Sequence, residues 1–529
     1  MDLGGGTIGG LIARRAASLP NKVALITPDG ELTYAELDAA RRGVTAGLQG
    51  LNLPTGSAVA VMMGNRAEWV TAWLGTVSAG LVCVPVNTAY KGTFLEHALT
   101  LTSATTIITE PKFLPALAAV ADQTDLRHVV VVDDATQEVP GARVMGFDEI
   151  ILKGGSGSEE PVATKPSDTA VVALTSGTTG KSKGVVTSHL MQLVAARENA
   201  ECLLTTTRDT LYTCLPMFHG AAQINICLHG FYLGATVVLA ERFSASRFWD
   251  DVRRHGVTVF NALGSVLPML LAQPPRTNDR DNRVRVVFAA PAPPEVLLPF
   301  EDRFGVHVVE GYGLTEIKNV TYNPIDARRV GSIGKPTRTT ELAIHDDDGN
   351  ALGPGEIGEI VYRPKVANVM FNEYLGNPES TLETMRGLWW HTGDLGYVDA
   401  DGFYWFVDRK KDALRRRGEN ISSYEVEAVL LSYPGILAAA AVGTPSELGE
   451  DEVLAVVEVD DTSTVDYPSL FRHCDDHLPH FMVPRYYRAV EAFPRTPTGK
   501  IQKSVLRSEG VDNHTWDADA AGHEATRIR

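Results

Sequence analysis

Short apolar runs alternate with helical patterns through the first third of the chain, and the same rhythm returns after Val171. An apolar run of about four to eight residues is typical of a buried strand, whereas apolar residues three and four apart indicate a helix. The capping-box spacing of Thr33 and Glu36 predicts a helix that runs to Leu48. The pattern further predicts strands at 23–27, 59–63, 82–86, 105–109 and 128–132, and a helix at 67–79. Repeated strand–helix units with apolar strands predict doubly wound, largely parallel sheets in an α/β fold.

The pattern changes toward the C-terminus. Strands at 357–362 and 403–407, with a turn at 399–402 between them, predict a small antiparallel β-barrel region. A charged run at 409–412 marks a boundary between a large N-terminal domain, 1–408, and a small α+β C-terminal domain, 413–510. The segment 511–529 is polar and lacks apolar periodicity, so we expect a frayed tail there.

Composition narrows the class of protein. The chain has 529 residues and a formal net charge of -17, with no basic face of the kind that nucleic-acid binders carry. Its five scattered cysteines favour reduced thiols, and the N-terminus lacks the pattern of a signal peptide, so we expect a cytoplasmic protein. The uncharged stretch 69–90 contains glycine, proline and asparagine, which favours a buried helix and strand over a membrane span.

The most informative segment is a loop rich in glycine and hydroxyl groups, residues 174–184, directly after the apolar strand 171–173. Glycines let the backbone approach a polyphosphate, and Lys181 and Lys183 supply positive charge in an acidic protein. A flexible linker is the alternative, but linkers seldom follow a buried strand directly and carry flanking lysines. A P-loop is excluded, because Thr175 stands where that motif needs glycine.

This loop resembles the phosphate-loop signature of the adenylate-forming enzymes, which include acyl-CoA synthetases such as fatty-acid and carnitine-type CoA ligases, peptide-synthetase adenylation domains and firefly luciferase. Ser182 replaces the usual proline. The resemblance implies that ATP and AMP contact the loop, and the residues concerned are Thr175, Ser176, Gly177, Thr178, Thr179, Gly180 and Lys183.

Two further motifs match the same family in the same order. In the segment 311–316, which opens with Gly311, the resemblance implies that Tyr312 stacks on adenine, Thr315 contacts the α-phosphate and Glu316 holds Mg²⁺. In the segment 390–396, Asp394 falls at the position that binds the ribose hydroxyls, and Arg409 at that of a second ribose contact. A carboxylate suits the first ribose role because it accepts hydrogen bonds from two hydroxyls. For each motif the alternative is a surface turn.

The last two matches lie near the C-terminus. The resemblance places a hinge at Lys411, within 409–412, about which the C-terminal domain rotates between two half-reactions. It also places Lys500 between the substrate carboxylate and the α-phosphate, where a cation stabilises two mutually repelling anions. An exposed charge run and an exposed tail lysine are the alternatives.

The acyl site is predicted from the segment 215–220 and from small residues nearby. Amino-acid-activating relatives carry an aspartate where this chain has Phe218 and His219, which disfavours an amino-acid substrate. His219 either gates the pocket or packs in it. The predicted walls are Phe218, Ala262, Gly264, Ala289, Ala290 and Gly313. Apart from Phe218, these residues have small side chains or none, which favours a bulky or branched acyl group.

The acceptor is predicted from the segment 415–420. Gly418 falls where CoA ligases pass the pantetheine thiol, and the arginines 415–417 are candidate contacts for CoA phosphates. Together these features predict an ATP-dependent acid–thiol ligase that forms an acyl-adenylate and transfers the acyl group to coenzyme A. An acyl carrier protein as acceptor, a luciferase-like oxidative enzyme, an enzyme of one half-reaction and a regulatory nucleotide-binding protein are the alternatives. A homodimer is compatible with the sequence.

Overall fold

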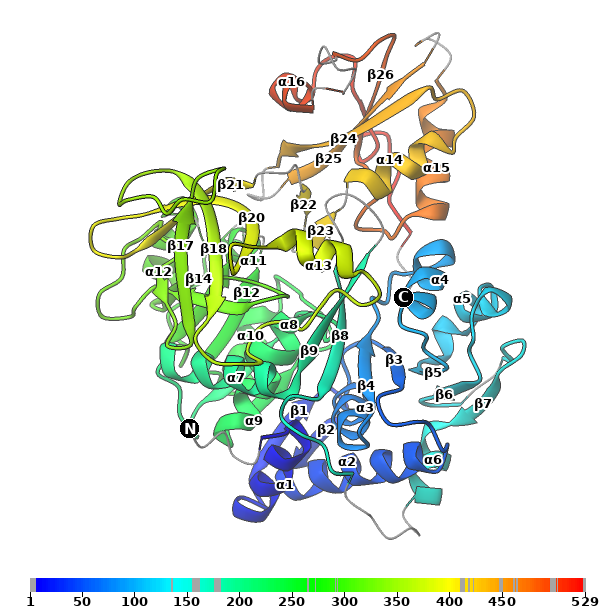
Figure 1. Cartoon of the computed structure of the whole chain (residues 1–529), viewed down its shortest axis with the longest axis vertical. Helices are drawn as coiled ribbons and strands as arrows, with labels where there is room; N and C mark the ends of the chain where they lie inside the picture. Colours follow the sequence, from blue (N-terminus) through cyan, green and yellow to red (C-terminus); the bar gives the residue numbers. More distant parts are fainter. Residues whose placement is uncertain are drawn as a thin grey trace. The chain divides into compact units, whose positions relative to one another are not determined.

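A computed structural model of the chain describes residues 6–134, 137–154, 162–175, 182–263, 266–271, 273–290, 292, 294–409, 414–416, 419–421, 423–446, 451–459, 462, 465–494, 501 and 503–526. It divides into two compact units (Figure 1). The first comprises Met1–Thr88, Leu99–Leu174 and Gly184–Asp408, and the second comprises Ala89–Ala98, Thr175–Lys183 and Arg409–Arg529. This division separates Asp408 from Arg409, at the start of the charged run.

The first unit is built on two large sheets. In the nine-stranded sheet the strand order is β16 (Lys335–Pro336), β15 (Lys318–Tyr322), β14 (His307–Leu314), β13 (Val286–Ala290), β12 (Val259–Leu263), β10 (Thr210–Thr213), β11 (Thr236–Leu239), β1 (Val23–Thr27) and β2 (Gly30–Thr33). The strands from β14 to β1 are parallel, and antiparallel strands close both edges.

The seven-stranded sheet has the order β7 (Arg143–Gly146), β6 (His128–Val131), β5 (Thr106–Thr109), β3 (Ala58–Met62), β4 (Val82–Pro85), β8 (Thr169–Thr175) and β9 (Lys183–Ser188). Its strands pair in parallel from β7 through to β8. The predicted doubly wound α/β class is confirmed, as is the capping box of Thr33 and Glu36, which opens helix α2 (Tyr34–Gln49).

The helices of this unit follow the expected alternation. The longer ones are α1 (Ile8–Ser18), α3 (Ala67–Ser78), α7 (His189–Cys202) and α12 (Pro294–Phe304), whereas most of α4 (Gly92–Leu101) belongs to the segment Ala89–Ala98 of the second unit. The shorter ones are α5 (Leu114–Ala118), α6 (Phe147–Gly154), α8 (Gly220–Ala222), α9 (His229–Leu233), α10 (Phe248–Arg254), α11 (Val266–Leu271) and α13 (Pro378–Thr384), with a π-helix η3 (Gln223–Leu228) between α8 and α9. The uncharged stretch forms α3 and β4, and among the described residues no helix has the length and hydropathy that crossing a membrane requires.

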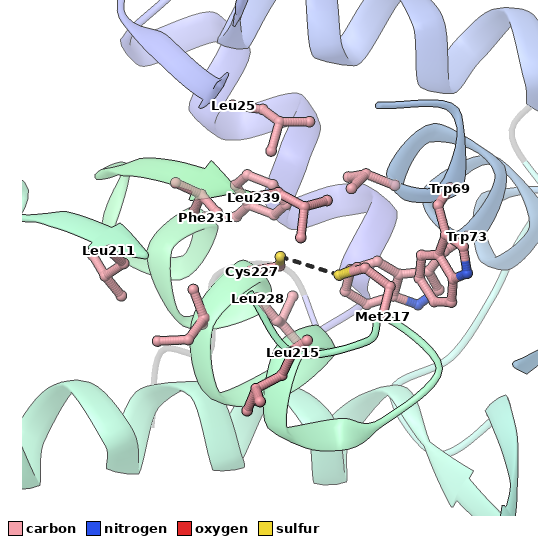
Figure 2. Close-up of a cluster of buried hydrophobic side chains, with 14 of the residues drawn as sticks. Leu25, Trp69, Trp73, Leu211, Leu215, Met217, Cys227, Leu228, Phe231 and Leu239 are labelled. Atoms are coloured by element: carbon pink, nitrogen blue, oxygen red, sulfur yellow. Dashed lines mark hydrogen bonds between the residues drawn. The ribbon is translucent and has the colours of Figure 1, made fainter. Parts of the chain in front are cut away.

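One apolar core connects the two large sheets (Figure 2). Trp69 and Trp73 of α3 belong to the same buried cluster as Leu25 of β1 and Leu239 of β11. Burying a large side chain contributes about 1.5–3 kcal/mol relative to leaving it exposed, so this cluster holds the sheets together as one body.

A third, antiparallel sheet forms the region predicted as a small β-barrel. Its strands are β17 (Thr340–His345), β18 (Gly358–Pro364), β20 (Trp389–Val398), β19 (Met385–Arg386) and β21 (Tyr404–Arg409). Its core includes Tyr362 and Trp390, and it also contains Tyr312 of β14.

The second unit is the predicted small α+β module. A four-stranded sheet, β24 (Ala438–Pro445), β25 (Asp451–Glu458), β26 (Tyr486–Val490) and β27 (Trp516–Asp517), is accompanied by α14 (Ser423–Leu431), α15 (Tyr467–His477), α16 (Lys503–Glu509) and the hairpin β22 (Leu414–Arg416) with β23 (Glu419–Ile421).

The expectation of a frayed tail is wrong for residues 511–526. Strand β27 pairs with β26, Trp516 stacks on Tyr467 at 5.8 Å, and Ala518 is fully buried. Arg485 also makes a paired hydrogen bond with Asp517, at 3.0 and 2.8 Å. The attachments come from a two-residue strand and from scattered, mostly polar side chains, which produce no apolar periodicity in the sequence.

Candidate active site

Two residues that are predicted to contact the nucleotide lie next to each other in the first unit. Tyr312 lies on β14 and Asp394 lies on β20, and the Tyr312 hydroxyl donates a hydrogen bond of 2.6 Å to Oδ2 of Asp394. Both side chains are buried. The proposed adenine and ribose residues, 82 positions apart, therefore belong to one site rather than to separate surface turns. Because a hydrogen bond to an ionised acceptor is roughly twice as strong as a neutral one, this pair fixes both side chains.

Glu359 holds the backbone next to Asp394. It lies on β18, and its Oε1 accepts a hydrogen bond of 3.0 Å from the Gly393 amide, while its Oε2 lies 3.0 Å from Nδ1 of His391. Gly393 has a φ of 75°, a left-handed conformation that glycine adopts without strain. The Asp394 amide donates in turn to the Thr392 hydroxyl at 3.0 Å. These contacts determine the direction of the Asp394 side chain.

Glu316 is held by a tyrosine that the sequence analysis did not identify. The Tyr374 hydroxyl donates to Oε1 of Glu316 at 2.8 Å, and the Phe371 amide donates to the Glu316 carbonyl at 2.7 Å. Burial, and secondarily the charge of Glu316, raise the pKa of Tyr374 well above its ordinary value. Tyr374 therefore remains a donor, and the Glu316 carboxylate has a fixed position.

The strand that leaves the phosphate loop is bonded to the segment that carries Tyr374. The Leu375 amide donates to the Gly184 carbonyl at 2.8 Å, and the Asn372 amide donates to the Val186 carbonyl at 2.8 Å. A Cβ at Gly184 would lie 3.2 Å from Cβ of Leu375, so the two segments pack closely. Thr175 ends β8 and Lys183 begins β9, both half-buried. Ser176, Gly177, Thr178, Thr179 and Gly180 lie outside the described residues.

The residues around Glu316 fit a magnesium ion that is shared with a nucleotide. Among the described residues, no group of three or more histidine, cysteine, aspartate or glutamate side chains is arranged for a metal. Mg²⁺ is commonly held by one or two carboxylates together with substrate phosphates, and a carboxylate oxygen accepts more than one partner. The bond from Tyr374 is therefore compatible with a metal at Glu316.

The predicted acyl residues lie on neighbouring parallel strands. Ala262 of β12 pairs with Ala289 of β13, and Ala289 pairs with Glu310 of β14. Ligands of α/β folds bind at the carboxyl ends of parallel strands, which is where these residues lie. Ala290 ends β13 and is half-buried, whereas Gly264 lies outside the described residues.

Close packing explains the two glycines of the Gly-Tyr-Gly motif. A Cβ at Gly311 would lie 2.7 Å from the Phe288 ring, and a Cβ at Gly313 would lie 2.3 Å from the Lys318 carbonyl and 2.8 Å from Oδ1 of Asn319. Phe218 and His219 are half-buried with ring centroids 4.6 Å apart. Both predicted readings of His219, gate and packing residue, remain compatible with this contact.

A buried ion pair anchors the turn that carries Thr315 and Glu316. Lys318 has a φ of 59°, and its Nζ lies 2.5 Å from Oε2 of Glu198 on α7, with both side chains 1% exposed. Burial alone would raise the pKa of Glu198, but the charge of Lys318 together with the hydrogen bonds from Lys318 and Thr339 outweighs burial, and the pKa lies below its ordinary value. Thr315 itself is exposed.

Much of the predicted second-unit site falls outside the described residues, namely Lys411, Gly418 and Lys500, while Arg409 is described only by its backbone at the end of β21. One sequence-based interpretation is wrong. Arg416 is buried, its Nε lies 2.7 Å from Oε2 of Glu452, and its Nη1 donates to the Val483 carbonyl at 2.7 Å, so it packs inside the module instead of facing a CoA phosphate. Its position on a strand with Leu414 places it on the buried face.

Sequence reasoning missed Tyr374, Glu359 and Asn319, each of which touches a predicted site residue or its neighbour. Tyr374 follows Phe371 in a segment that leads into α13, whose N-cap is Asn377. That cap signals a helix start and identifies no ligand. Their roles become visible only through contacts between distant segments.

Comparisons with known proteins agree with this geometry. The family described as AMP-binding enzyme matches residues 12–375, and the AMP-binding enzyme C-terminal domain matches residues 425–500. A crotonobetaine/carnitine–CoA ligase from Shigella sonnei is 32% identical over 482 residues, which cover 90% of this chain and 93% of that protein. One from Escherichia coli is also 32% identical and covers 86% of this chain and 89% of that protein.

Solved structures show the same fold. The amide bond synthetase McbA from Marinactinospora thermotolerans has a TM-score of 0.83 at 26% identity, with 95% of this chain and all of that chain covered. An o-succinylbenzoate CoA synthetase from Bacillus subtilis has a TM-score of 0.79 at 26% identity, with 94% and 98% covered. An anthranilate CoA ligase in complex with anthranoyl-AMP has a TM-score of 0.73 at 27% identity, with 95% and 97% covered.

The predicted enzyme class, an AMP-forming acid–thiol ligase, is confirmed. The chain belongs to the AMP-binding enzyme family, the adenylate-forming superfamily that its phosphate loop and its Tyr312 and Asp394 motifs resemble.

Proposed function

We propose that the protein is an acyl-CoA synthetase. It activates a carboxylic acid with ATP to give an acyl-adenylate and pyrophosphate, and it then transfers the acyl group to coenzyme A with release of AMP. The observation that carries this proposal is the 2.6 Å hydrogen bond between Tyr312 and Asp394, because it joins an aromatic ring suited to adenine with a carboxylate suited to ribose. The names of the relatives, CoA ligases among them, support the acceptor.

In the first half-reaction each side chain has a charge-based role. Asp394 accepts hydrogen bonds from the ribose hydroxyls, and Thr315, exposed on its turn, donates to the α-phosphate. The hydroxyl, amide and ammonium groups of Thr175, Lys183 and the segment 176–180 serve as hydrogen-bond donors to the phosphates of ATP. Mg²⁺, when bound at Glu316, neutralises phosphate charge. Lys500 stabilises the charge that develops as the carboxylate attacks phosphorus.

In the second half-reaction the C-terminal unit changes its position about Lys411. Gly418 then allows the pantetheine chain to pass, because a side chain there would obstruct it. The thiolate of coenzyme A attacks the acyl carbonyl, the carbonyl–phosphate bond breaks, and AMP leaves. The alternatives are a carrier-protein thiol in place of coenzyme A, and an enzyme that performs only one of the two half-reactions.

The test measures the two half-reactions separately over a panel of carboxylic acids. Pyrophosphate release reports adenylation, and the mass of the CoA thioester reports transfer. We expect Lys500→Ala to reduce adenylation by about 10²- to 10³-fold, since a single charge-stabilising group has this size of effect. Asp394→Asn should raise the Kd for ATP, and Gly418→Leu should slow only the thioester step.

Two results would contradict the proposal. The first is unchanged adenylation in Lys500→Ala, and the second is pyrophosphate release without a CoA thioester for every acid that is activated. Equal loss of both half-reactions in Gly418→Leu would reject the passage assigned to Gly418.

A further inference from the structure

Three asparagines and a tyrosine meet beside the predicted acyl site. Asn199 comes from α7, Asn225 from the π-helix η3, and Asn319 and Tyr322 from β15. We call these four residues the asparagine cluster. π-Helical turns occur frequently at functional sites, and here the turn places Asn225 toward the other members. His229 supports this turn, since its Nδ1 lies 3.1 Å from the Asn225 carbonyl.

The hydrogen bonds of the asparagine cluster have a fixed direction that begins at Tyr322. Burial raises the pKa of Tyr322 well above its ordinary value, so its hydroxyl keeps its proton and donates it to Oδ1 of Asn199. Asn199 must then present its amide nitrogen to Oδ1 of Asn225, at 3.2 Å. Asn319 directs its own nitrogen to the Tyr322 hydroxyl at 2.9 Å and to Oδ1 of Asn225 at 3.1 Å.

This direction leaves two polar groups with hydrogen-bonding capacity toward other molecules. Nδ2 of Asn225 and Oδ1 of Asn319 bond to no other group in the part of the chain that the structure describes. Both residues are half-buried, whereas Asn199 and Tyr322 are buried behind them. Oδ1 of Asn319 would lie 2.8 Å from a Cβ at Gly313, so it lies directly against a predicted acyl residue.

The neighbouring charges cancel. Glu198 and Lys318 precede Asn199 and Asn319 in the chain, and they pair with one another at 2.5 Å. A second charge on the acyl group would therefore be desolvated without a counter-charge here, which is costly. The site offers one acceptor, Oδ1 of Asn319, beside one donor, Nδ2 of Asn225. A neutral hydroxyl group matches both, because it can donate one hydrogen bond and accept another.

We propose that Asn319 and Asn225 form a polar subsite that selects carboxylic acids bearing a neutral hydroxyl group on the acyl chain. The inference rests on the proposed function and names its substrate class. The hydroxyl donates to Oδ1 of Asn319 and accepts from Nδ2 of Asn225. A hydrocarbon acyl group in the same place leaves both amide groups without a partner, and an enzyme site discriminates most strongly in that situation.

The test compares kcat/KM for pyrophosphate release between acids that differ only by the hydroxyl. Suitable pairs are 3-hydroxybutyrate with butyrate, 3-hydroxyoctanoate with octanoate, and 4-hydroxybenzoate with benzoate, with succinate and 4-aminobutyrate as charged members. For at least one pair we expect a preference for the hydroxy acid of about tenfold or more. Asn319→Leu and Asn225→Leu should each remove that preference while the unsubstituted acid is still activated.

Asn278→Leu, an exposed asparagine in the loop before β13, is the matched control and should retain the preference. If Asn319→Leu melts at a much lower temperature, Asn225→Ala replaces it, because that change removes the amide group of Asn225 without placing a larger apolar side chain in the asparagine cluster. Equal or better activity with every unsubstituted acid, or a preference that survives substitution at both asparagines, overturns the inference and leaves the acyl-CoA synthetase proposal intact. Absence of pyrophosphate release with every acid overturns both.

Discussion

The Tyr312–Asp394 pair and the Lys318–Glu198 pair each join a carboxylate to a donor from a distant part of the chain. In the first pair both members lie in short motifs, and both are proposed to contact the nucleotide. In the second pair neither member belongs to a motif, and both are 1% exposed. The comparison separates a nucleotide side, built from motif residues with tyrosine support, from an acyl side, built on a buried polar network. The first can be recognised in the sequence, whereas the second depends on which segments pack together.

Breaking the Lys318–Glu198 pair on the acyl side should have the largest effect, a loss of stability. Lys318→Met leaves the Glu198 carboxylate buried without its counter-ion, so the free energy of unfolding should fall by about 3–5 kcal/mol. Denaturant unfolding followed by tryptophan fluorescence measures this change. Arg280→Met is the matched control, because the Arg280–Asp302 pair is exposed and should contribute about 1 kcal/mol or less. Equal effects of the two substitutions would remove the distinction between the two sides.

Strand β14 carries Tyr312 of the nucleotide side and Gly313 of the acyl side. Glu310 lies on this strand directly before Gly311, so its ionisation tests how the strand responds to pH. It is 6% exposed, its carboxylate accepts hydrogen bonds from the Ala292 and Gly331 amides, and burial raises its pKa from 4.5 to about 7. The folded protein therefore keeps a proton that the unfolded chain releases above pH 4.5, so this group's contribution to stability falls as the pH rises from 4.5 to 7.

Glu310→Gln should remove this contribution to the pH dependence. A shift of this size corresponds to at most about 3 kcal/mol, so the variant should gain up to that amount over the unaltered protein at pH 8 and little at pH 4.5. Melting temperatures across this range measure the difference. A constant offset between the two proteins at every pH would show that Glu310 does not titrate in this window.

Tyr374→Phe tests the tyrosine support on the nucleotide side and should have the smallest effect of these substitutions, a change in the KM for Mg·ATP. It removes the hydroxyl that holds Glu316 at 2.8 Å but keeps the ring in the core. We expect KM for Mg·ATP to rise by about tenfold, in line with one hydrogen bond to a charged group, with kcat for adenylation and the melting temperature nearly unchanged. A fall in kcat with KM unchanged would mean that Tyr374 acts on the transition state and does not merely position Glu316.

Sequence reasoning reached the fold and the nucleotide side for a physical reason. Apolar periodicity follows directly from which face of a strand or helix is buried, so β3, α3 and the capping box at Thr33 could be predicted locally. The same reasoning failed for Arg416 and for the tail at Trp516, where a charged residue and a polar segment are buried by a few specific contacts.

The sequence by itself determined the α/β class and the order of the motifs, and it supplied the candidate groups for contact with a nucleotide, because each of these depends on residues close together in the chain. Only the tertiary structure decided that Tyr312 meets Asp394, that Tyr374 holds Glu316, and that Asn225 and Asn319 lie side by side. These contacts join segments from 58 to 94 residues apart. Their geometry depends on how helices and sheets pack against one another, and short-range periodicity carries no record of that packing.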